Sequence, residues 1–290
     1  MVKNSIDLFA DEALCETVFQ HASLSFGIIR GMVRLIVNAD DFGIDKNRTS
    51  AILESFRVGA ITQTTALANM EYFPEAAKRI ADEGRLDWMG IHLNLTEGRP
   101  LTESMRRSMF FCDSNGEFNS LFHRDYKKRF YIPHSLDGII RDELRAQIEQ
   151  FLRNGGVYMH ADSHHHIHTD FSIARVAFPL LNEYGFKSLR KSRNIGAGLS
   201  FGKRMYKSVF NRWAAANFEC SEYFCSFCDL KAALTSIPGH STVEVMVHPM
   251  FGRPGALDDN AALTDSGNPM ASEVKFYRDN RDRLVFHDRD

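Results

Sequence analysis

Hydrophobic and polar positions along the chain alternate between two periods from residue 34 onwards. Short apolar runs rich in β-branched residues predict strands at "RLIVNADDFG" (34–43), "AITQTTALANM" (60–70) and "WMGIHLNLT" (88–96). Between these runs, apolar residues recur at helical spacing in "NRTSAILESFRVGAI", where Asn47 or Thr49 is expected to cap the helix, and in "FPEAAKRIADEG". The order strand, helix, strand, helix, strand predicts parallel strands joined by helices.

The same alternation resumes after an irregular excursion over residues 106–130. Helices are predicted over 138–156, 173–186 and 199–217, and strands over 157–166, 187–192 and 241–249. At 290 residues, this pattern favours an α/β fold of the TIM-barrel kind. We expect an irregular (β/α) barrel with a parallel sheet of seven strands over residues 32–290, preceded by an extension at 1–31.

The composition of the chain argues against some classes of binding partner and indicates a cellular compartment. Lys and Arg (35) nearly balance Asp and Glu (37), so no positive field recruits nucleic acid. No apolar stretch is long enough for a membrane span, and the acidic start is unlike a secretory signal. The five cysteines are odd in number and suggest a reducing cytoplasm. Cys225 and Cys228 form a single C-x-x-C, a weak zinc or redox signal against a reading as ordinary thiols.

Chemically versatile side chains follow several predicted strands. Asp40 and Asp41 end one strand, His92 lies in another, a histidine run fills 160–168 and His248 follows the last. Strand ends are where parallel α/β folds gather working residues, and carboxylate with imidazole suits a hydrolytic divalent-metal site. Considered one at a time, His92 and His248 are more simply explained as hydrogen-bonded core residues. The adjacent aspartates are more simply explained as part of a turn or helix cap. Two adjacent carboxylates at a buried strand end are costly, however, unless a cation neutralises them.

The run "HADSHHHIH" holds five imidazoles in nine positions. It is internal and interrupted, unlike a purification tag. His160, His164 and His168 would share one face of a helix, but the preceding "GGVYM" is a poor helix former and no H-E-x-x-H motif is present. On a strand, Asp162, His164 and His166 would share one face, so the five histidines cannot all bind one ion.

Five segments in order, "LIVNADDFG", "ITQTTALANM", "GIHLNLTEGRPL", "HADSHHHIH" and "EVMVHP", resemble the signature segments of the YdjC-like carbohydrate deacetylase family over roughly residues 33–250. The resemblance implies an irregular barrel, one divalent metal ion (Mg²⁺ or Zn²⁺) and hydrolysis of the acetyl group of an N-acetylated sugar such as chitobiose or a chitooligosaccharide. It implies Asp41, His92 and His164 as metal ligands and Asp40 as the catalytic base.

Further roles complete this hypothesis. A histidine can protonate the amine leaving group, for which His248 is favoured over His168. Asp162 is expected to fix an imidazole tautomer and Arg190 to orient Asp40. The remaining polar candidates are substrate contacts or ordinary packing residues: Thr64, Thr65, Asn94, His160, His165 and His166. The expected partner is an acetylated mono- or oligosaccharide, and a homodimer stays open.

Two rival functions share the same barrel. One is a metal-dependent hydrolase of phosphoesters or cyclic amides, which the basic stretch from Lys187 to Arg212 would favour. The other is an inactive sugar- or metal-binding module, which would have no need of a base beside the metal. The resemblance also sets an expectation for the far end. Family members continue after "FYRDNRDRL" through a further helix and strand, so the closing element of the barrel and the stability of the fold are in doubt.

Overall fold

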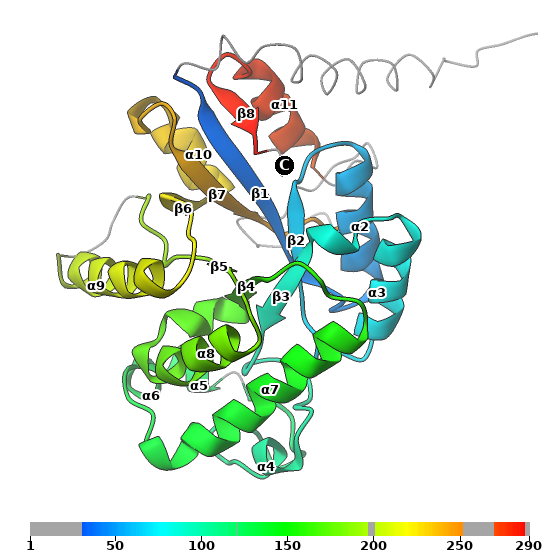
Figure 1. Cartoon of the computed structure of the whole chain (residues 1–290), viewed down its shortest axis with the longest axis vertical. Helices are drawn as coiled ribbons and strands as arrows, with labels where there is room; N and C mark the ends of the chain where they lie inside the picture. Colours follow the sequence, from blue (N-terminus) through cyan, green and yellow to red (C-terminus); the bar gives the residue numbers. More distant parts are fainter. Residues whose placement is uncertain (1–30, 120, 197–200, 252–269, 288–290) are drawn as a thin grey trace, which may run out of the picture.

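The computed structural model describes residues 31–119, 121–196, 201–251 and 270–287. The predicted extension at 1–31 therefore lies almost wholly outside the described residues. Within them, one curled sheet with only parallel ladders runs through the molecule, surrounded by helices (Figure 1). Its strands are β1 (Val33–Phe42), β2 (Gln63–Ala66), β3 (Met89–Leu93), β4 (His160–Ser163), β5 (Ser188–Leu189), β6 (Tyr223–Ser226), β7 (Thr242–Val247) and β8 (Leu284–Phe286).

The strand order makes this sheet an irregular barrel. Seven strands follow the path β5-β4-β3-β2-β1-β7-β6, which becomes the sequential order β1 to β7 once β5 and β6 are joined. Isolated backbone hydrogen bonds join these two ends in place of a ladder. The amide of Leu189 donates to the Glu219 carbonyl (3.0 Å) and the amide of Asn194 to the Phe224 carbonyl (3.2 Å). The prediction of a TIM-barrel-like α/β fold with seven parallel strands is confirmed.

Helices alternate with the strands, as the helical periodicity predicts. Their bounds are α2 (Lys46–Arg57), α3 (Phe73–Asp82), α4 (Glu103–Arg106), α5 (Leu121–Arg124), α6 (Tyr126–Phe130), α7 (Asp137–Arg153), α8 (Phe171–Glu183), α9 (Phe201–Asn217), α10 (Phe227–Ala233) and α11 (Ala271–Asp279). The predicted cap of α2 was wrong. The N-cap is Asp45, whose side chain accepts a hydrogen bond from the Arg48 amide at 2.8 Å.

The C-terminal part adds a helix and a strand beyond β7. After α11, the three residues of β8 pair in parallel with Val33–Leu35, the first three residues of β1. β2 pairs with the later part of β1, from Asn38 onward. The described residues thus include a strand beyond β7 that joins the sheet, which answers the question that the sequence left open at this end (Figure 1).

The histidine run also departs from its predicted strand. β4 ends at Ser163, and residues His164–Thr169 form the short 3₁₀ segment η5. Inside it, His165 (φ 52°) and His166 (φ 56°) adopt left-handed backbone conformations. The chain therefore turns sharply after Ser163, and the expected alternation of side chains between two strand faces does not extend past that residue.

The two faces of β1 separate the hydrophobic core from the polar interior. Leu35, Val37 and Ala39 belong to the apolar cluster that includes the helices, whereas Asn38 and Asp40 are buried but hydrogen-bonded to polar side chains. Because successive side chains of a strand point to opposite faces, the same ten residues build the core and line the site. Among the described residues, no helix has the length and apolar character needed to cross a membrane.

Candidate metal centre and active site

An irregularity at the end of β1 brings two adjacent carboxylates to one place. The register between β1 and β2 shifts between Ala39 and Phe42, and Asp41 has a left-handed backbone (φ 67°). Such a conformation costs about 1–3 kcal/mol for a residue other than glycine and is concentrated at functional sites. As a result, Asp40 and Asp41 both lie near one imidazole. Nε2 of His248 is 3.9 Å from an oxygen of Asp40 and 3.9 Å from one of Asp41. This irregularity breaks the alternation of side chains along the strand, which would otherwise direct Asp40 and Asp41 to opposite faces of the sheet.

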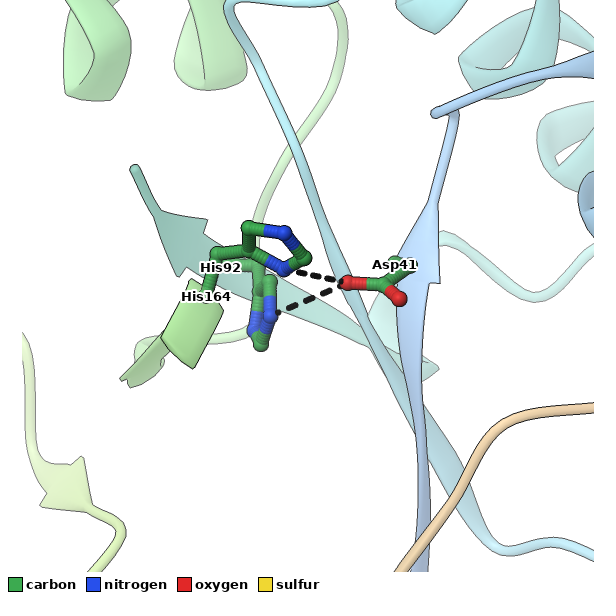
Figure 2. Close-up of side chains that lie close together, drawn as sticks. All are labelled: Asp41, His92 and His164. Carbon is green, nitrogen blue, oxygen red and sulfur yellow. Dashed lines mark hydrogen bonds and ion pairs between the residues drawn. The ribbon is translucent and has the colours of Figure 1, made fainter. Parts of the chain in front are cut away.

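Asp41, His92 and His164 converge on one point, from the ends of β1, β3 and β4. Nδ1 of His164 lies 2.8 Å and Nε2 of His92 lies 3.3 Å from the same oxygen, Oδ1 of Asp41 (Figure 2). All three residues are buried. One oxygen and two nitrogen donors form a set that suits Zn²⁺ or another borderline divalent ion and leaves positions open for water or substrate.

The second nitrogen of each histidine meets another carboxylate. Nδ1 of His92 lies 2.6 Å from Asp162, its neighbour in the ladder between β3 and β4, and Nε2 of His164 lies 2.8 Å from Glu97. Carboxylate–histidine pairs of this kind fix the tautomer and orientation of metal-binding imidazoles. Asp162, which the sequence analysis expects to fix an imidazole tautomer, contacts His92 in this way. Glu97 was missed, because its loop position gives no periodic signal.

The raised pKa values of His92 and His164 show which positive charges a metal cation would replace in this cluster. Burial lowers the pKa of His92, but the charge of Asp162 and hydrogen bonds to Asp162 and Asp41 outweigh it and raise the pKa to about 10. For His164, burial is likewise outweighed, mainly by Asp41, and the pKa rises to about 9. Protons on these two imidazoles therefore balance the buried carboxylates in the place where a divalent cation would do so, which fits the residues to a metal site.

Metal affinity should depend steeply on pH. With pKa values of about 10 and 9, His92 and His164 are protonated at pH 7, and a cation must displace the protons that face Asp41. Affinity for Zn²⁺ should rise with pH from 6 to 9, by about tenfold per unit for each proton released. Titration calorimetry at pH 7 in two buffers of different ionisation enthalpy would count these protons. Binding without proton release would contradict this assignment.

Glu97 offers a prediction of its own. The substitution Glu97→Gln removes the charge beside His164 Nε2, and we expect affinity for the metal to fall by about 10-fold, the lower end for an outer carboxylate, because Glu97 is half exposed. Glu103→Gln is the matched control, since Glu103 is an exposed glutamate in α4 that contacts Arg107 instead. Equal affinities in the two variants would remove Glu97 from the centre.

Arg190 organises the polar interior behind the metal centre. Its guanidinium is fully buried and contacts both oxygens of Asp40 (2.7 and 2.8 Å), Asp162 (2.7 Å) and Glu244 (2.5 Å). It also lies over the ring of Phe224 at 4.8 Å. Burial raises the pKa of Glu244 to about 7, although Arg190 opposes the shift. Arg190 thus occupies Asp40 and Asp162, whereas Asp41 directs Oδ1 at the two histidines and has Arg48 3.3 Å from Oδ2.

The other predicted residues are placed as follows. The hydroxyl of Thr65 lies 3.1 Å from Asp162 and 3.2 Å from His92 Nδ1. Asn94 is fully buried and binds the backbone of Thr96 and Glu97, so it shapes the loop that carries Glu97, which favours the structural alternative for it. Thr64 is likewise occupied, donating to the Ala39 carbonyl at 2.6 Å.

The remaining histidines of the run fall into two groups, those packed inside the fold and one exposed beside the metal centre. His168 is buried between the Ser163 hydroxyl (2.5 Å) and the Arg190 carbonyl (2.9 Å), and burial lowers its pKa to about 4. These contacts favour a structural role over that of a reserve acid. His160 contacts Ser188 at 2.9 Å, and His166 packs edge-on against Phe224. His165 is exposed beside the centre and stacks on His123 at 3.9 Å.

The C-x-x-C pair lies apart from these residues. Cys225 is buried in β6, whereas Cys228 is exposed at the start of α10. Burial raises the pKa of Cys225 to about 12, which disfavours the thiolate that a zinc or redox site requires. This environment supports the reading as ordinary thiols.

Known proteins match both the sequence and the fold. The model of the YdjC-like protein family matches residues 34–285. A carbohydrate deacetylase from Clostridium beijerinckii is 34% identical over 247 residues, covering 84% of this chain and 90% of that protein. One from Halalkalibacterium halodurans is 30% identical over 220 residues, covering 76% and 86%.

A solved structure agrees with the fold. The crystal structure of a proposed cellobiose-phosphate cleavage protein from Enterococcus faecalis V583 superposes with a TM-score of 0.63 at 22% identity, covering 88% of this chain and 97% of that one. At this level of identity the similarity concerns the fold alone. The family match spans every segment that forms the centre, the Clostridium relative covers most of the chain, and the chain belongs to the YdjC-like protein family.

Proposed function

We propose that this chain is a metal-dependent hydrolase that removes the acetyl group from an N-acetylated mono- or oligosaccharide. The observation that carries the proposal is the buried cluster of Asp41, His92 and His164 with two acid–base groups, Asp40 and His248, directly beside it. Relatives named carbohydrate deacetylase that align along most of the chain support the substrate class.

Each residue has a role that its contacts support. A divalent cation on Asp41, His92 and His164 would polarise the acetyl carbonyl and acidify a water molecule. Asp40 accepts the proton of the attacking water, and Arg190 and Asn38 fix its carboxylate in place at 2.7–2.8 Å. His248 lies 3.9 Å from Asp40 on the partly exposed side and donates a proton to the departing amine.

The donor set also guides the choice of metal. Two imidazole nitrogens and one carboxylate favour Zn²⁺ over Mg²⁺, which prefers oxygen ligands and keeps several waters. We propose one ion per chain, because Arg190 occupies the two neighbouring carboxylates, Asp40 and Asp162. The cysteine content supports a reducing compartment such as the cytoplasm. A homodimer stays a prediction.

Acetate release tests the proposal directly. Purified protein would be incubated with N,N'-diacetylchitobiose and a panel of other acetylated mono- and disaccharides, before and after treatment with a chelator. We expect acetate release that is lost with chelator and restored by one equivalent of metal ion.

The rival functions predict different results in the same assay. Two metal ions per chain together with hydrolysis of phosphoesters would favour the phosphoesterase alternative. One bound ion with no turnover of any acetylated sugar would favour a binding module. Release of acetate that survives complete removal of metal would contradict the proposed mechanism.

A further inference from the structure

A row of imidazole rings leads from the metal centre towards the surface, and its last two members have no part in the chemistry proposed above. The ring centroid of His165 lies 4.0 Å from that of His164, one of the proposed ligands. The ring of His123 stacks on His165 at 3.9 Å with an interplanar angle of 10°. Since His164 is buried, His165 exposed and His123 half-buried, the row joins the buried centre to the solvent-facing side.

The fold spends unusual structure on bringing these two rings together. His165 has a left-handed backbone (φ 52°), which is unfavourable for a residue other than glycine and is concentrated at functional sites. His123 belongs to α5, within the irregular excursion between β3 and β4 that the βα pattern does not require. The excursion therefore delivers a side chain to the edge of the metal centre.

Both rings are held in place by the protein itself. Phe122, the neighbour of His123, is fully buried and packs against Phe111 (5.1 Å) and Phe110 (6.0 Å). Nδ1 of His165 lies 2.9 Å from the hydroxyl of Thr96. The pair is thus positioned before any ligand arrives, which lowers the entropic cost of binding one.

His123 still has hydrogen-bonding capacity to offer. Among the described residues it forms no hydrogen bond, and its Nδ1 is buried without a partner, so Nε2 is the nitrogen that a ligand can reach. Burial, and the charges of Arg129 and Arg124, lower the pKa of His123. Its ring is therefore neutral at pH 7, with one nitrogen that donates and one that accepts.

We propose that His123 is a specificity-determining residue that binds a hydroxyl group of the acetylated sugar through Nε2. The inference rests on the proposed function, because an acetyl group bound beside His164 places the attached sugar next to His165 and His123. A neutral imidazole can donate to or accept from a hydroxyl group without favouring a charged ligand. A site that hydrogen-bonds a substrate hydroxyl discriminates against acetamides that lack it.

A second cation is the competing occupant of this place. Donor atoms of Glu97, His164 and His165 lie close enough together to hold one. Two of these donors are already engaged, however, because Nε2 of His164 meets Glu97 at 2.8 Å and Nδ1 of His165 meets Thr96 at 2.9 Å. His123 is not among these donors, so a second cation would leave its position unexplained.

Three substitutions separate the hydrogen bond from the stacking. His123→Phe keeps a flat ring against His165 but removes both nitrogens. His123→Gln places an amide near the position of Nε2 without a ring. His134→Phe is the matched control, because His134 lies in the same connection between β3 and β4 and its side chain is 76% exposed beside Asp137.

We expect H123F to raise the KM for acetate release from N,N'-diacetylchitobiose by about 3- to 10-fold, the value of one neutral hydrogen bond, with kcat within about twofold of the wild type. H123Q should have a KM between those of H123F and the wild type, and H134F should match the wild type. Metal affinity, measured by calorimetry, should be the same in all four proteins. A residue that only supported the fold around His164 would instead change kcat and metal affinity together.

Direct binding keeps the test independent of turnover. If no acetylated sugar is hydrolysed, the proposed function has failed, but calorimetric binding of N,N'-diacetylchitobiose to the metal-loaded full chain still decides the role of His123. Binding that is about 3- to 10-fold weaker in H123F would support that role. Equal KM and Kd in H123F and the wild type would overturn the inference and leave the proposed function in place. No sugar binding by the wild type, a loss in H123F that H123Q does not reduce, or a second bound ion that H123F lacks would also overturn it.

Discussion

Substitution of Asp40 by asparagine is expected to lower kcat for acetate release by about 10²- to 10⁴-fold, the usual contribution of a positioned base. The amide keeps the shape of the side chain and can still accept a hydrogen bond from Arg190, but it cannot take a proton. Metal binding should change little, because Asp41 and not Asp40 meets the two ligand histidines. Steady-state kinetics together with metal analysis of the variant would measure both quantities.

The matched control is Asp45→Asn, which removes a carboxylate from the exposed cap of α2 on the same chain segment. It should leave kcat close to the wild-type value, since asparagine caps helices as well as aspartate does. A D40N variant with wild-type kcat would remove Asp40 from the role of base. Loss of the metal in D40N would show that Asp40, and not only Asp41, holds it.

The sequence allowed the barrel and the positions of most site residues to be predicted. Each apolar run had an identifiable end, and parallel strands bring those ends to one side of the sheet. Asp41, His92 and His164 therefore meet although up to 123 residues separate them. The roles of these residues followed from their chemistry and from the family resemblance.

Other features could not be predicted because tertiary contacts decide them. Left-handed backbone at Asp41, His165 and His166 has no glycine to signal it. Glu97 reaches His164 only through a loop that Asn94 shapes. Four-residue β6 and three-residue β8, neither of which was predicted, are too short to show a period.

Glu244 was not predicted as part of the site, although the sequence contained a signal for it. It is a lone carboxylate inside the apolar run "TVEVMV", and a buried acid at such a position requires a cationic partner. Arg190, at the end of another predicted strand, is that partner. Pairing unmatched buried charges between strands, in addition to strand-end residues, would have located the ion network behind the metal centre.

Replacement of Arg190 by methionine should destabilise the fold by about 3–5 kcal/mol, as expected when one partner of a buried ion network is removed. Three buried carboxylates, those of Asp40, Asp162 and Glu244, would lose their shared cation. Urea unfolding followed by circular dichroism would measure the difference. Arg193→Met is the control, because Arg193 lies three residues further along and its ion pair with Asp229 is partly exposed, worth about 1 kcal/mol or less.

The pH dependence of this loss distinguishes a charge effect from a packing effect. Burial favours the neutral forms of Asp162 and Glu244 and Arg190 opposes it, so without Arg190 the pKa of each of these two carboxyls should rise. A group whose pKa is raised in the folded state favours folding at low pH and loses that contribution as the pH rises. The destabilisation of R190M should therefore grow from about pH 5 to pH 8. A loss that is constant over this range would instead indicate that the methionine fits the site poorly, and would leave the three carboxylates without need of Arg190.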